Sequence, residues 1–346
     1  MTGRRILLLI FGAAVLLGSA GAYLALRWWQ APLALPEAGL RIRLDAGESL
    51  GHLSSRLARA GVLRRPRLLN IAARIGGVDQ QLRRGEYQLP AGSSPADLLA
   101  LLRSGEVVRY RVTLPEGITL AQALQRLQSA PALRLHLVGP GDRRLLALVA
   151  PHADPEGLFL PETYQYRRGD SDLDVLAQAH GLMRTLLAEL WASRRPDLPY
   201  DSPYEALVLA SIVERETGVA AERARIAGVF LRRLQRGMRL QTDPAVIYGL
   251  GAAFDGNLTR AHLRDPGNRY NTYRHRGLPP TPIALPGRAA LRAAFDPAPG
   301  EALYFVARGD GSHHFSRTLE EHQRAVREYQ LKRRDGYRSA PLESER

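Results

Sequence analysis

The stretch from Ser202 to Thr217 reads Ser-Pro-Tyr-Glu-Ala-Leu-Val-Leu-Ala-Ser-Ile-Val-Glu-Arg-Glu-Thr, and it predicts a buried helix. Ser202 is a good N-cap, Pro203 fits the first helical position, and Glu205 completes a capping box. Apolar side chains at residues 206–210, 212 and 213 cover every side of the helix, which is typical of a helix buried all round. A carboxylate at the end of such a helix lies at the edge of a core. Its neutral form is favoured there and can donate a proton.

Two carboxylates, Glu214 and Glu216, end this helix. Two positions along a helix correspond to a rotation of roughly 200°, so the two side chains point to opposite sides. We expect one of them to face a cleft and the other to pair with an arginine. The alternative is that both are solvated residues at a helix end, since glutamate is common and mostly exposed.

Length and composition limit the classes of protein. The 346 residues suffice for about two domains, and the absence of cysteine excludes a disulfide framework. The net charge of +14 is carried almost wholly by arginine, with Lys332 the single lysine. Because this charge is spread along the chain and no nucleic-acid motif accompanies it, we expect no nucleic-acid partner.

The N-terminus predicts a membrane anchor. Residues 1–5 carry two arginines, and residues 6–26 form an uncharged, mostly apolar run. A helix of that length spans roughly 30 Å, the thickness of the hydrocarbon core. The preceding arginines favour a cytoplasmic N-terminus, and Trp28 and Trp29 are typical of the interface. Residues 27–39 are then a linker, and the remaining chain lies outside the cytoplasm.

A cleavable signal peptide is the alternative, with Ala20-Gly21-Ala22 as the small-residue cleavage site. The apolar run continues past that site and is longer than a usual signal sequence, which favours the uncleaved anchor.

Residues 40–106 predict a small α+β module. A strand with Ile42 and Leu44 precedes a helix, a second helix follows near 67–75, and a second strand begins at Gly85. A third helix is capped at Ser94. The motif I-x-L-x-x-G-E-S-L and the strand–helix–helix–strand order resemble a LysM-type module, a fold associated with amino-sugar polymers. A generic α+β domain without a ligand is the alternative.

The rest of the chain predicts a mixed domain, so the fold class is α+β throughout. Residues 107–150 form a linking subdomain with a strand and a helix, and 151–332 form a core. Helices are expected near 174–194 and 221–236, with a strand at 302–307 and a closing helix at 319–329. Between residues 237 and 301 we expect mainly loops. The charged residues 333–346 predict a disordered tail.

Several long motifs occur in a fixed order and together resemble the YceG-like family of endolytic murein transglycosylases. They cover roughly residues 40 to 330. The chain departs from the family pattern at Thr281, where glycine is usual, and at Leu285, where a polar residue is usual. In chain order the motifs are Glu156-Gly157, Pro161-Glu162-Thr163-Tyr164, Ala210-Ser-Ile-Val-Glu-Arg-Glu-Thr, Gly237-Met-Arg-Leu-Gln-Thr-Asp-Pro, Tyr270-Asn-Thr-Tyr, Gly277-Leu-Pro-Pro, Tyr304-Phe-Val-Ala and Gly311-Ser-His-His-Phe-Ser.

The resemblance implies a single-pass inner-membrane protein with a cytoplasmic N-terminus and a periplasmic catalytic region at 107–332. Its partners would be peptidoglycan glycan strands and inner-membrane lipid, with peptidoglycan synthases as candidate partners. It would cut the β-1,4 bond between N-acetylmuramic acid and N-acetylglucosamine of nascent strands internally. Such cutting leaves 1,6-anhydro ends and terminates elongation. By the motif match, Glu214 is the catalytic acid and base, and no cofactor is expected.

One carboxylate can suffice for this reaction. Ordinary glycosidases use two, one to protonate the leaving oxygen and one to attack or to activate water. Here the sugar's own 6-hydroxyl would attack, which benefits from a high effective concentration. Glu214 would first protonate the glycosidic oxygen and then accept the hydroxyl proton.

Polar side chains in later loops suit sugar hydroxyl and acetamido groups, and loops on a scaffold commonly carry binding residues. The alternative is that they cap turns and hold the loops. The substrate-binding candidates are Glu216, Gln241, Thr242, Asp243, Asn271, Thr272, Tyr273 and His313. Adjacent histidines on a strand point to opposite faces, so we expect no metal site at His313 and His314. One of them could line the cleft near Glu214.

Two rival functions remain at this stage. One is a non-catalytic, peptidoglycan-binding scaffold of the wall-synthesis machinery, and the other is a hydrolytic muramidase that adds water. The helix-borne Glu214 favours an enzyme over a scaffold.

Overall fold

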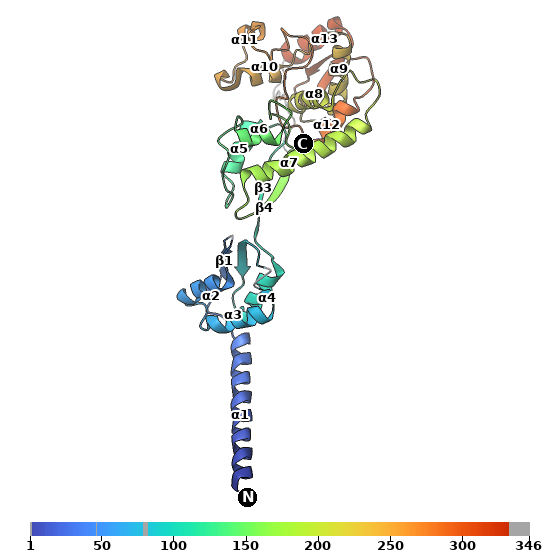
Figure 1. Cartoon of the computed structure of the whole chain (residues 1–346). Helices are drawn as coiled ribbons and strands as arrows, with labels where there is room; N and C mark the ends of the chain where they lie inside the picture. The colour runs from blue at the N-terminus through green and yellow to red at the C-terminus, as the bar shows by residue number, and fades with distance from the viewer. Residues whose placement is uncertain (1, 46, 79–81, 332–346) are drawn as a thin grey trace. The chain divides into compact units, whose positions relative to one another are not determined.

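The computed structural model describes residues 2–45, 47–78 and 82–331, so the predicted tail at 333–346 lies outside the described residues. The chain divides into two compact units, Met1–Tyr110 with Tyr166–Gly169, and Arg111–Gln165 with Asp170–Arg346. Strands β3 (Arg109–Thr113) and β4 (Thr163–Arg167) pair with each other and carry the chain between the units (Figure 1). Helices and two-stranded sheets make up both, which confirms the α+β class.

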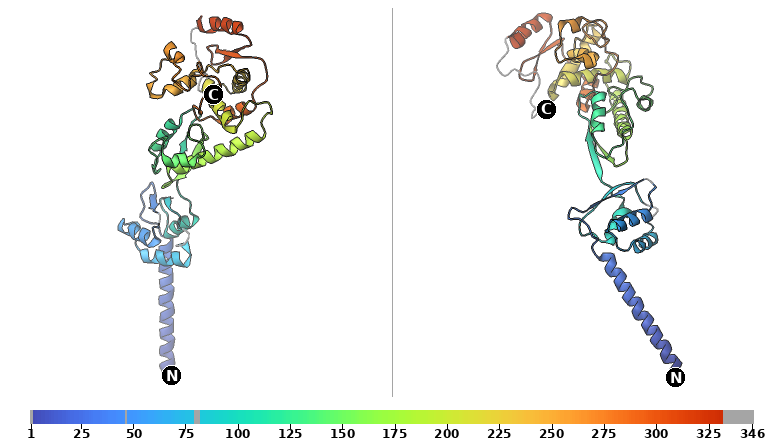
Figure 2. Two further views of the ribbon diagram at one scale, coloured as in Figure 1. Left: turned by 45° about the horizontal axis from the view of Figure 1, so that its top comes forward. Right: turned by 90° about the vertical axis from the view of Figure 1, so that its left-hand side faces the viewer.

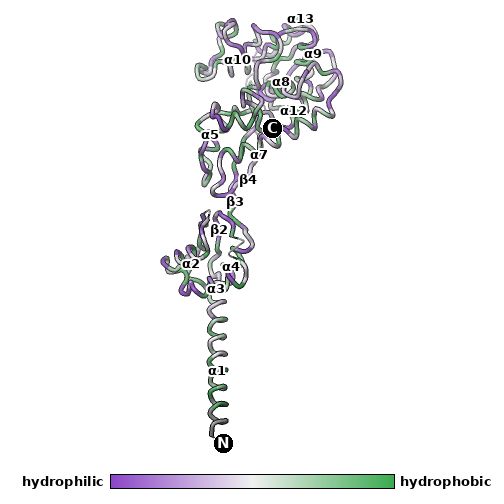
Figure 3. The backbone as a smooth tube through the Cα atoms, viewed as in Figure 1, coloured by the Kyte–Doolittle hydropathy of each residue, from purple (hydrophilic) through white to green (hydrophobic). Residues whose placement is uncertain are grey.

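Helix α1 (Thr2–Gln30) opens the first unit and continues beyond the apolar run predicted for a membrane span. The stretch Ile10–Gln30 is long and apolar enough to cross a membrane. Its mean hydropathy is 1.5, and none of its most apolar part is buried inside the protein. Much of α1 is coloured on the hydrophobic side in Figure 3. Trp28 and Trp29 lie in its last turn and pack against the core of the unit.

The remaining elements of the first unit follow the order predicted from the sequence. They are β1 (Leu40–Leu44), α2 (Leu50–Arg59), α3 (Pro66–Ile75), β2 (Gly85–Leu89) and α4 (Pro95–Ser104). The two strands pair antiparallel over their whole length. This order is the one that suggested a LysM-type module, and that likeness stays a prediction.

Capping residues and a shared core explain why these short elements form. The Ser49 hydroxyl accepts the His52 N–H at the start of α2, and Ser94 and Asp97 form a full capping box at α4. Apolar side chains from every element meet inside the unit, with Leu53, Leu69, Tyr87, Leu98 and Leu102 completely buried.

The second unit is mainly helical, and Figure 1 labels most of its elements. Helix α8 lies at its centre and contacts α7, α9, α10 and α12. Figure 2 shows β5, β6 and α13 side by side at one end of the unit. The elements are α5 (Leu120–Gln128), α6 (Arg143–Leu148), α7 (Asp172–Ala192), α8 (Pro203–Glu216), the 3-10 helix Ala220–Glu222, α9 (Arg223–Gln235), α10 (Asp243–Leu250), the 3-10 helix Gly251–Ala253, α11 (Arg260–Arg264), α12 (Arg288–Phe295), β5 (Tyr304–Ala307), β6 (His313–Ser316), α13 (Leu319–Val326) and the π-helix Arg327–Leu331.

Helix α8 has the predicted bounds, and all residues from 206 to 213 are buried. The Ser202 hydroxyl accepts the Glu205 N–H at 3.4 Å, and Pro203 occupies the first turn. The predicted capping box is wrong in one respect. The Glu205 carboxylate accepts the N–H of Asp201 at 2.9 Å instead of the N–H of Ser202.

Most of residues 237–301 are loops, as expected, but three short helices, α10, α11 and α12, lie among them. These helices are five to eight residues long, too short for a clear period in the sequence. Helix α12 buries Ala290, Leu291, Ala294 and Phe295 against α8 and α9. The alanines of α12 give only a weak hydrophobic signal in the sequence, but their small side chains allow the helices to approach closely.

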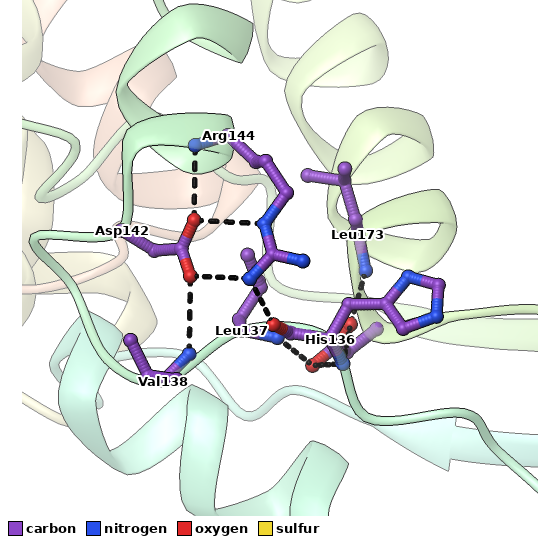
Figure 4. A network of polar contacts seen from close by, with 7 residues as sticks. His136, Leu137, Val138, Asp142, Arg144 and Leu173 are labelled. Atoms are coloured by element: carbon purple, nitrogen blue, oxygen red, sulfur yellow. Dashed lines mark hydrogen bonds and ion pairs between the residues drawn. The ribbon is translucent and has the colours of Figure 1, made fainter.

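Two aspartates fix the loop that leads into α6 (Figure 4). Asp172, the first residue of α7, accepts the N–H groups of His136 and Leu137 at 3.0 Å each. Asp142 accepts the Val138 N–H at 3.2 Å and bonds the Arg144 guanidinium, which holds the pKa of that carboxyl well below its usual range. The loop is thereby held against the start of α7.

A buried carboxylate joins α5 to α10. Glu156 is 5% exposed, and it accepts the N–H of Leu120 at 2.9 Å and the hydroxyl of Tyr248 at 3.2 Å. Burial raises its pKa to about 7, and these two hydrogen bonds only partly oppose that effect.

Glu156 therefore makes the stability of the protein depend on pH. The folded chain retains a proton that the unfolded chain releases near pH 4.5. The resulting stabilisation is complete below that pH and is lost as the pH rises through about 7. A pKa shift of this size corresponds to a difference of about 3 kcal/mol in the free energy of unfolding between low and high pH.

We expect the Glu156→Gln variant to have a higher melting temperature than wild type at pH 8, by several degrees more than at pH 5. The reason is that glutamine stays neutral at both pH values, whereas Glu156 becomes charged at the higher one. The measurement is the melting temperature of the full chain in detergent at both pH values. Glu301→Gln removes an exposed carboxylate paired with Arg317 and serves as the control, with no such difference. Equal shifts at both pH values would contradict the assignment.

Candidate active site

Glu214 lies in the last turn of α8 with its side chain only 6% exposed. Its Oε2 accepts the N–H of Gly287 at 3.0 Å, and its Oε1 lies 3.5 Å from Nη2 of Arg223. One carboxylate at the edge of the core is therefore held by a backbone donor and approached by one cation. This position agrees with that expected from the buried helix.

Two loops beside Glu214 are held together by backbone hydrogen bonds. The N–H of Gly117 donates to the carbonyl of Leu285, and the N–H of Leu285 donates to the carbonyl of Ile118, both at 2.8 Å. Arg215 donates to the Gly117 carbonyl at 3.0 Å. The loop after β3 and the loop before α12 therefore form one backbone frame around the end of α8.

The loop before α12 is fixed to α8 as well. The N–H of Ile283 donates to the hydroxyl of Ser211, a buried residue in the middle of α8, at 3.0 Å. Thr281, which departs from the family pattern, lies within hydrogen-bonding distance of the Tyr270 hydroxyl at 2.8 Å. Leu285, the other departure, is completely buried. Both departures lie inside the loop that positions Gly287.

The structure places Glu216 on a different side of α8 from Glu214, as helical geometry predicts. Its carboxylate accepts a hydrogen bond from the hydroxyl of Thr242, and the neighbouring Arg215 donates to the Gly117 carbonyl instead of pairing with it. Burial raises the pKa of Glu216 to about 7, with Asp243 adding to the rise and Thr242 and Arg233 opposing it. Glu216 thus belongs to a network separate from that of Glu214.

Three of the substrate-binding candidates bond inside the protein. Thr242, Asn271 and Thr272 are buried. The Thr272 hydroxyl accepts the Thr242 N–H at 2.9 Å, and the Asn271 amide donates to the carbonyls of His262 and Asp265. These contacts are the loop-holding role that the sequence left as the alternative.

Two other candidates remain accessible on the same loops. Gln241 and Asp243 are exposed, and the hydroxyl of Tyr273 donates to Asp243 at 2.6 Å. Gln241 adopts a φ of 53°, a left-handed conformation that is uncommon for a residue with a side chain. The frame that holds this turn is the bond from the Gln241 N–H to the Thr272 carbonyl.

His313 is held away from Glu214 by a buried acid. Its N–H donates to Glu222 at 2.9 Å, and its Nδ1 lies 2.7 Å from the same carboxylate. Glu222 directly precedes Arg223, the cation near Glu214, so His313 is linked to the site through the start of α9. Among the residues that the structure describes, no group of three or more His, Cys, Asp or Glu is placed to hold a metal ion.

A cleft of about 780 Å³ lies beside the end of α8. Arg215 and Ile283 line it, together with Glu156 and Tyr248. Arg215 follows Glu214 in α8, but its side chain points to another side of the helix, and Glu214 is not among the residues that line this cleft. Apolar walls with a few polar groups are typical of a ligand site.

A further acidic residue, Glu116, lies close to this site. Its carboxylate lies against Gly287, the residue that donates to Glu214. The Pro-Glu-Gly turn after a strand gave no signal of this, because the approach depends on loops separated by about 170 residues.

Comparisons with known proteins agree with these motifs. The chain matches the YceG-like family over residues 42–328. It is 26% identical over 313 residues to a protein of Bacillus subtilis (strain 168) named endolytic murein transglycosylase, covering 84% of each chain. It is also 26% identical over 330 residues to a protein of the same name from Streptococcus pneumoniae serotype 2, of which it spans 58%.

The fold has a relative among solved structures. A putative YceG-like protein from Listeria monocytogenes aligns with a TM-score of 0.52 at 25% identity, over 82% of this chain and 98% of the other. Because the family match covers most of the described chain, including the loops around Glu214, this protein belongs to the YceG-like family.

Proposed function

We propose that this protein is a lytic transglycosylase that cuts peptidoglycan strands internally. The observation that carries the proposal is Glu214, a nearly covered carboxylate at the end of an apolar helix. The relatives named endolytic murein transglycosylase support the same substrate class and reaction. The bond cut is the β-1,4 link from N-acetylmuramic acid to N-acetylglucosamine.

The reaction needs one proton donor that later becomes an acceptor. Glu214 in its acid form protonates the glycosidic oxygen, and the bond from that oxygen to C1 of the muramic residue breaks. The 6-hydroxyl of the same residue attacks C1, and its proton passes to the Glu214 carboxylate. A 1,6-anhydro end forms, Glu214 regains its acid form, and no water is consumed.

The backbone frame around Glu214 supports this role. The Gly287 N–H fixes one oxygen of the carboxylate, and the other lies near Arg223. A carboxylate fixed in this way loses little freedom when the transition state forms.

The N-terminal helix supports a place for the enzyme at the membrane. We assign 6–26 as a single-pass span of the inner membrane, with residues 1–5 in the cytoplasm, 27–39 as a linker and the catalytic region at 107–332 in the periplasm. The apolar, exposed stretch of α1 and the arginines before it support this arrangement. Lipid and newly made strands, with their synthases, would be its surroundings.

The first unit supports a second contact with the strand, through a LysM-like module at 40–106. A pocket of about 610 Å³ opens between the loop after β1 and the end of α3. Ser49, Asn70 and Arg74 line it. Asn70 lines this pocket, and its covered Oδ1 has no hydrogen-bond partner among the described residues.

We expect Glu214→Gln to lower the rate of strand cleavage at least about 100-fold, because the proton donor is lost. The measurement is mass spectrometry of purified peptidoglycan digested by the full-length enzyme, with anhydro ends counted. Glu189→Gln, an exposed change on α7, is the matched control and keeps full activity. Anhydro ends released by Glu214→Gln at the wild-type rate would overturn the assignment. Reducing muramic ends from wild type would instead identify a hydrolytic muramidase.

We expect Asn70→Ala to weaken binding of the inactive Glu214→Gln protein to insoluble peptidoglycan by about tenfold, the value of one good buried hydrogen bond. The measurement is a sedimentation assay across protein concentrations. Asn257→Ala, an exposed asparagine in the second unit, is the control. Equal binding by both variants would show that the pocket does not contact the strand.

A further inference from the structure

Glu116 is held close to Gly287, the residue that donates to Glu214, by its neighbours in the chain. It follows the end of β3 in the Pro115–Thr119 turn, and the next residue, Gly117, bonds the Leu285 backbone and accepts from Arg215. The backbone on the C-terminal side of Glu116 is therefore tied both to the loop before α12 and to the end of α8. The position of its side chain follows from contacts that also hold Glu214.

Gly287 lies between the two carboxylates. Its N–H donates to Oε2 of Glu214 at 3.0 Å, while a Cβ added to it would lie 1.8 Å from Oε1 of Glu116. A side chain at this position would have to displace the Glu116 carboxylate. Because the φ of Gly287 is −76°, this close approach and not the backbone conformation is what favours glycine here. The missing side chain lets both carboxylates contact one residue.

Glu116 lies close enough to Glu214 and Arg223 for their charges to change its pKa. Partial burial raises the pKa of Glu116, the charges of Glu214 and Glu162 raise it further, and Arg223 opposes them. Gly287 is also the N-cap of α12, whose positive end favours nearby carboxylates. Two acids are thus held close together without a direct ion pair for Glu116.

The two carboxylates differ in exposure and in partners. Glu214 is almost covered and accepts a backbone N–H, whereas Glu116 is exposed. Within the described parts of the chain, no hydrogen bond or ion pair engages the Glu116 carboxylate. It is therefore free to face a substrate that lies over Glu214.

We propose that Glu116 is a second catalytic carboxylate, which faces the anomeric carbon of the sugar whose bond Glu214 cleaves. This inference rests on the proposed function. As the bond from C1 to the leaving oxygen breaks, positive charge develops on C1 and the ring oxygen. The negative charge of Glu116 stabilises it without forming a bond.

Proton transfer in this scheme involves Glu214 alone. Its proton goes to the leaving oxygen, the 6-hydroxyl oxygen forms the new bond to C1, and the hydroxyl proton returns to Glu214. Glu116 neither gains nor loses a proton, so atoms and charge balance without water or a cofactor. The step requires an ionised Glu116, a form that partial burial disfavours and that the charge of Arg223 favours.

The test is Glu116→Gln in the full-length enzyme in detergent, with anhydro ends measured on purified peptidoglycan. We expect kcat to fall at least about 30-fold, with KM and the melting temperature close to wild type. We also expect the wild-type rate to fall at low pH as Glu116 becomes protonated, and the residual activity of the variant to lack that acidic limb. Glu116→Asp should recover part of kcat.

Glu162→Gln is the matched control, because it removes another carboxylate close to the start of α12, one paired with Arg288 at 3.0 Å. Its kcat should stay within about threefold of wild type, as expected for an exposed ion pair. A second, independent readout is Gly287→Ala, whose new methyl group displaces the Glu116 carboxylate. It should lower kcat in the wild type but add little to Glu116→Ala, where that space is empty.

Other results would overturn the proposal. If Glu116→Gln keeps the wild-type kcat, or keeps the acidic limb, Glu116 only stabilises the start of α12. The same conclusion would follow if Glu116→Gln lowered the melting temperature as well as kcat and Glu116→Asp recovered neither. If the wild-type enzyme itself forms no anhydro ends, the proposed function fails and this inference fails with it. Anhydro ends from the wild type combined with an active Glu116→Gln refute only the role of Glu116.

Discussion

The structure of the second unit depends on the burial of α8 on every side. A helix whose residues 206–213 are all buried has to be surrounded by other elements, and α7, α9, α10 and α12 supply them. The chain after α8 returns to cover it, and the loop before α12 bonds to Ser211 in the middle of the helix. The carboxylate at the end of α8 consequently emerges where these covering elements stop.

The frame around that carboxylate consists of backbone groups. Bonds between Gly117, Ile118 and Leu285 join two distant loops, and Gly287 donates to Glu214 from the end of one of them. Backbone donors are fixed by the fold and hold their geometry without side-chain entropy.

Glu214 and Glu216, the two acids at the end of α8, have different roles because they have different partners. Glu216 bonds Thr242 within a network that continues to Thr272, so its carboxylate holds the loop after α9. Glu214 and Glu116 meet at Gly287 on the other side of the helix. One protein thus uses buried acids in two ways, as loop supports at Glu156 and Glu216 and as candidate chemistry at Glu214.

The sequence by itself determined the elements whose pattern is local. The membrane-length helix, the capped helices of the first unit, the bounds of α8 and the opposite directions of Glu214 and Glu216 follow from periodicity, capping and helical rotation over a few residues. The tertiary structure alone decided the short helices α10 to α12, the inward bonding of Thr242, Asn271 and Thr272, and the approach of Glu116 to Gly287. Those features depend on contacts between segments far apart in the chain, and no local pattern encodes which distant backbone group a side chain will meet.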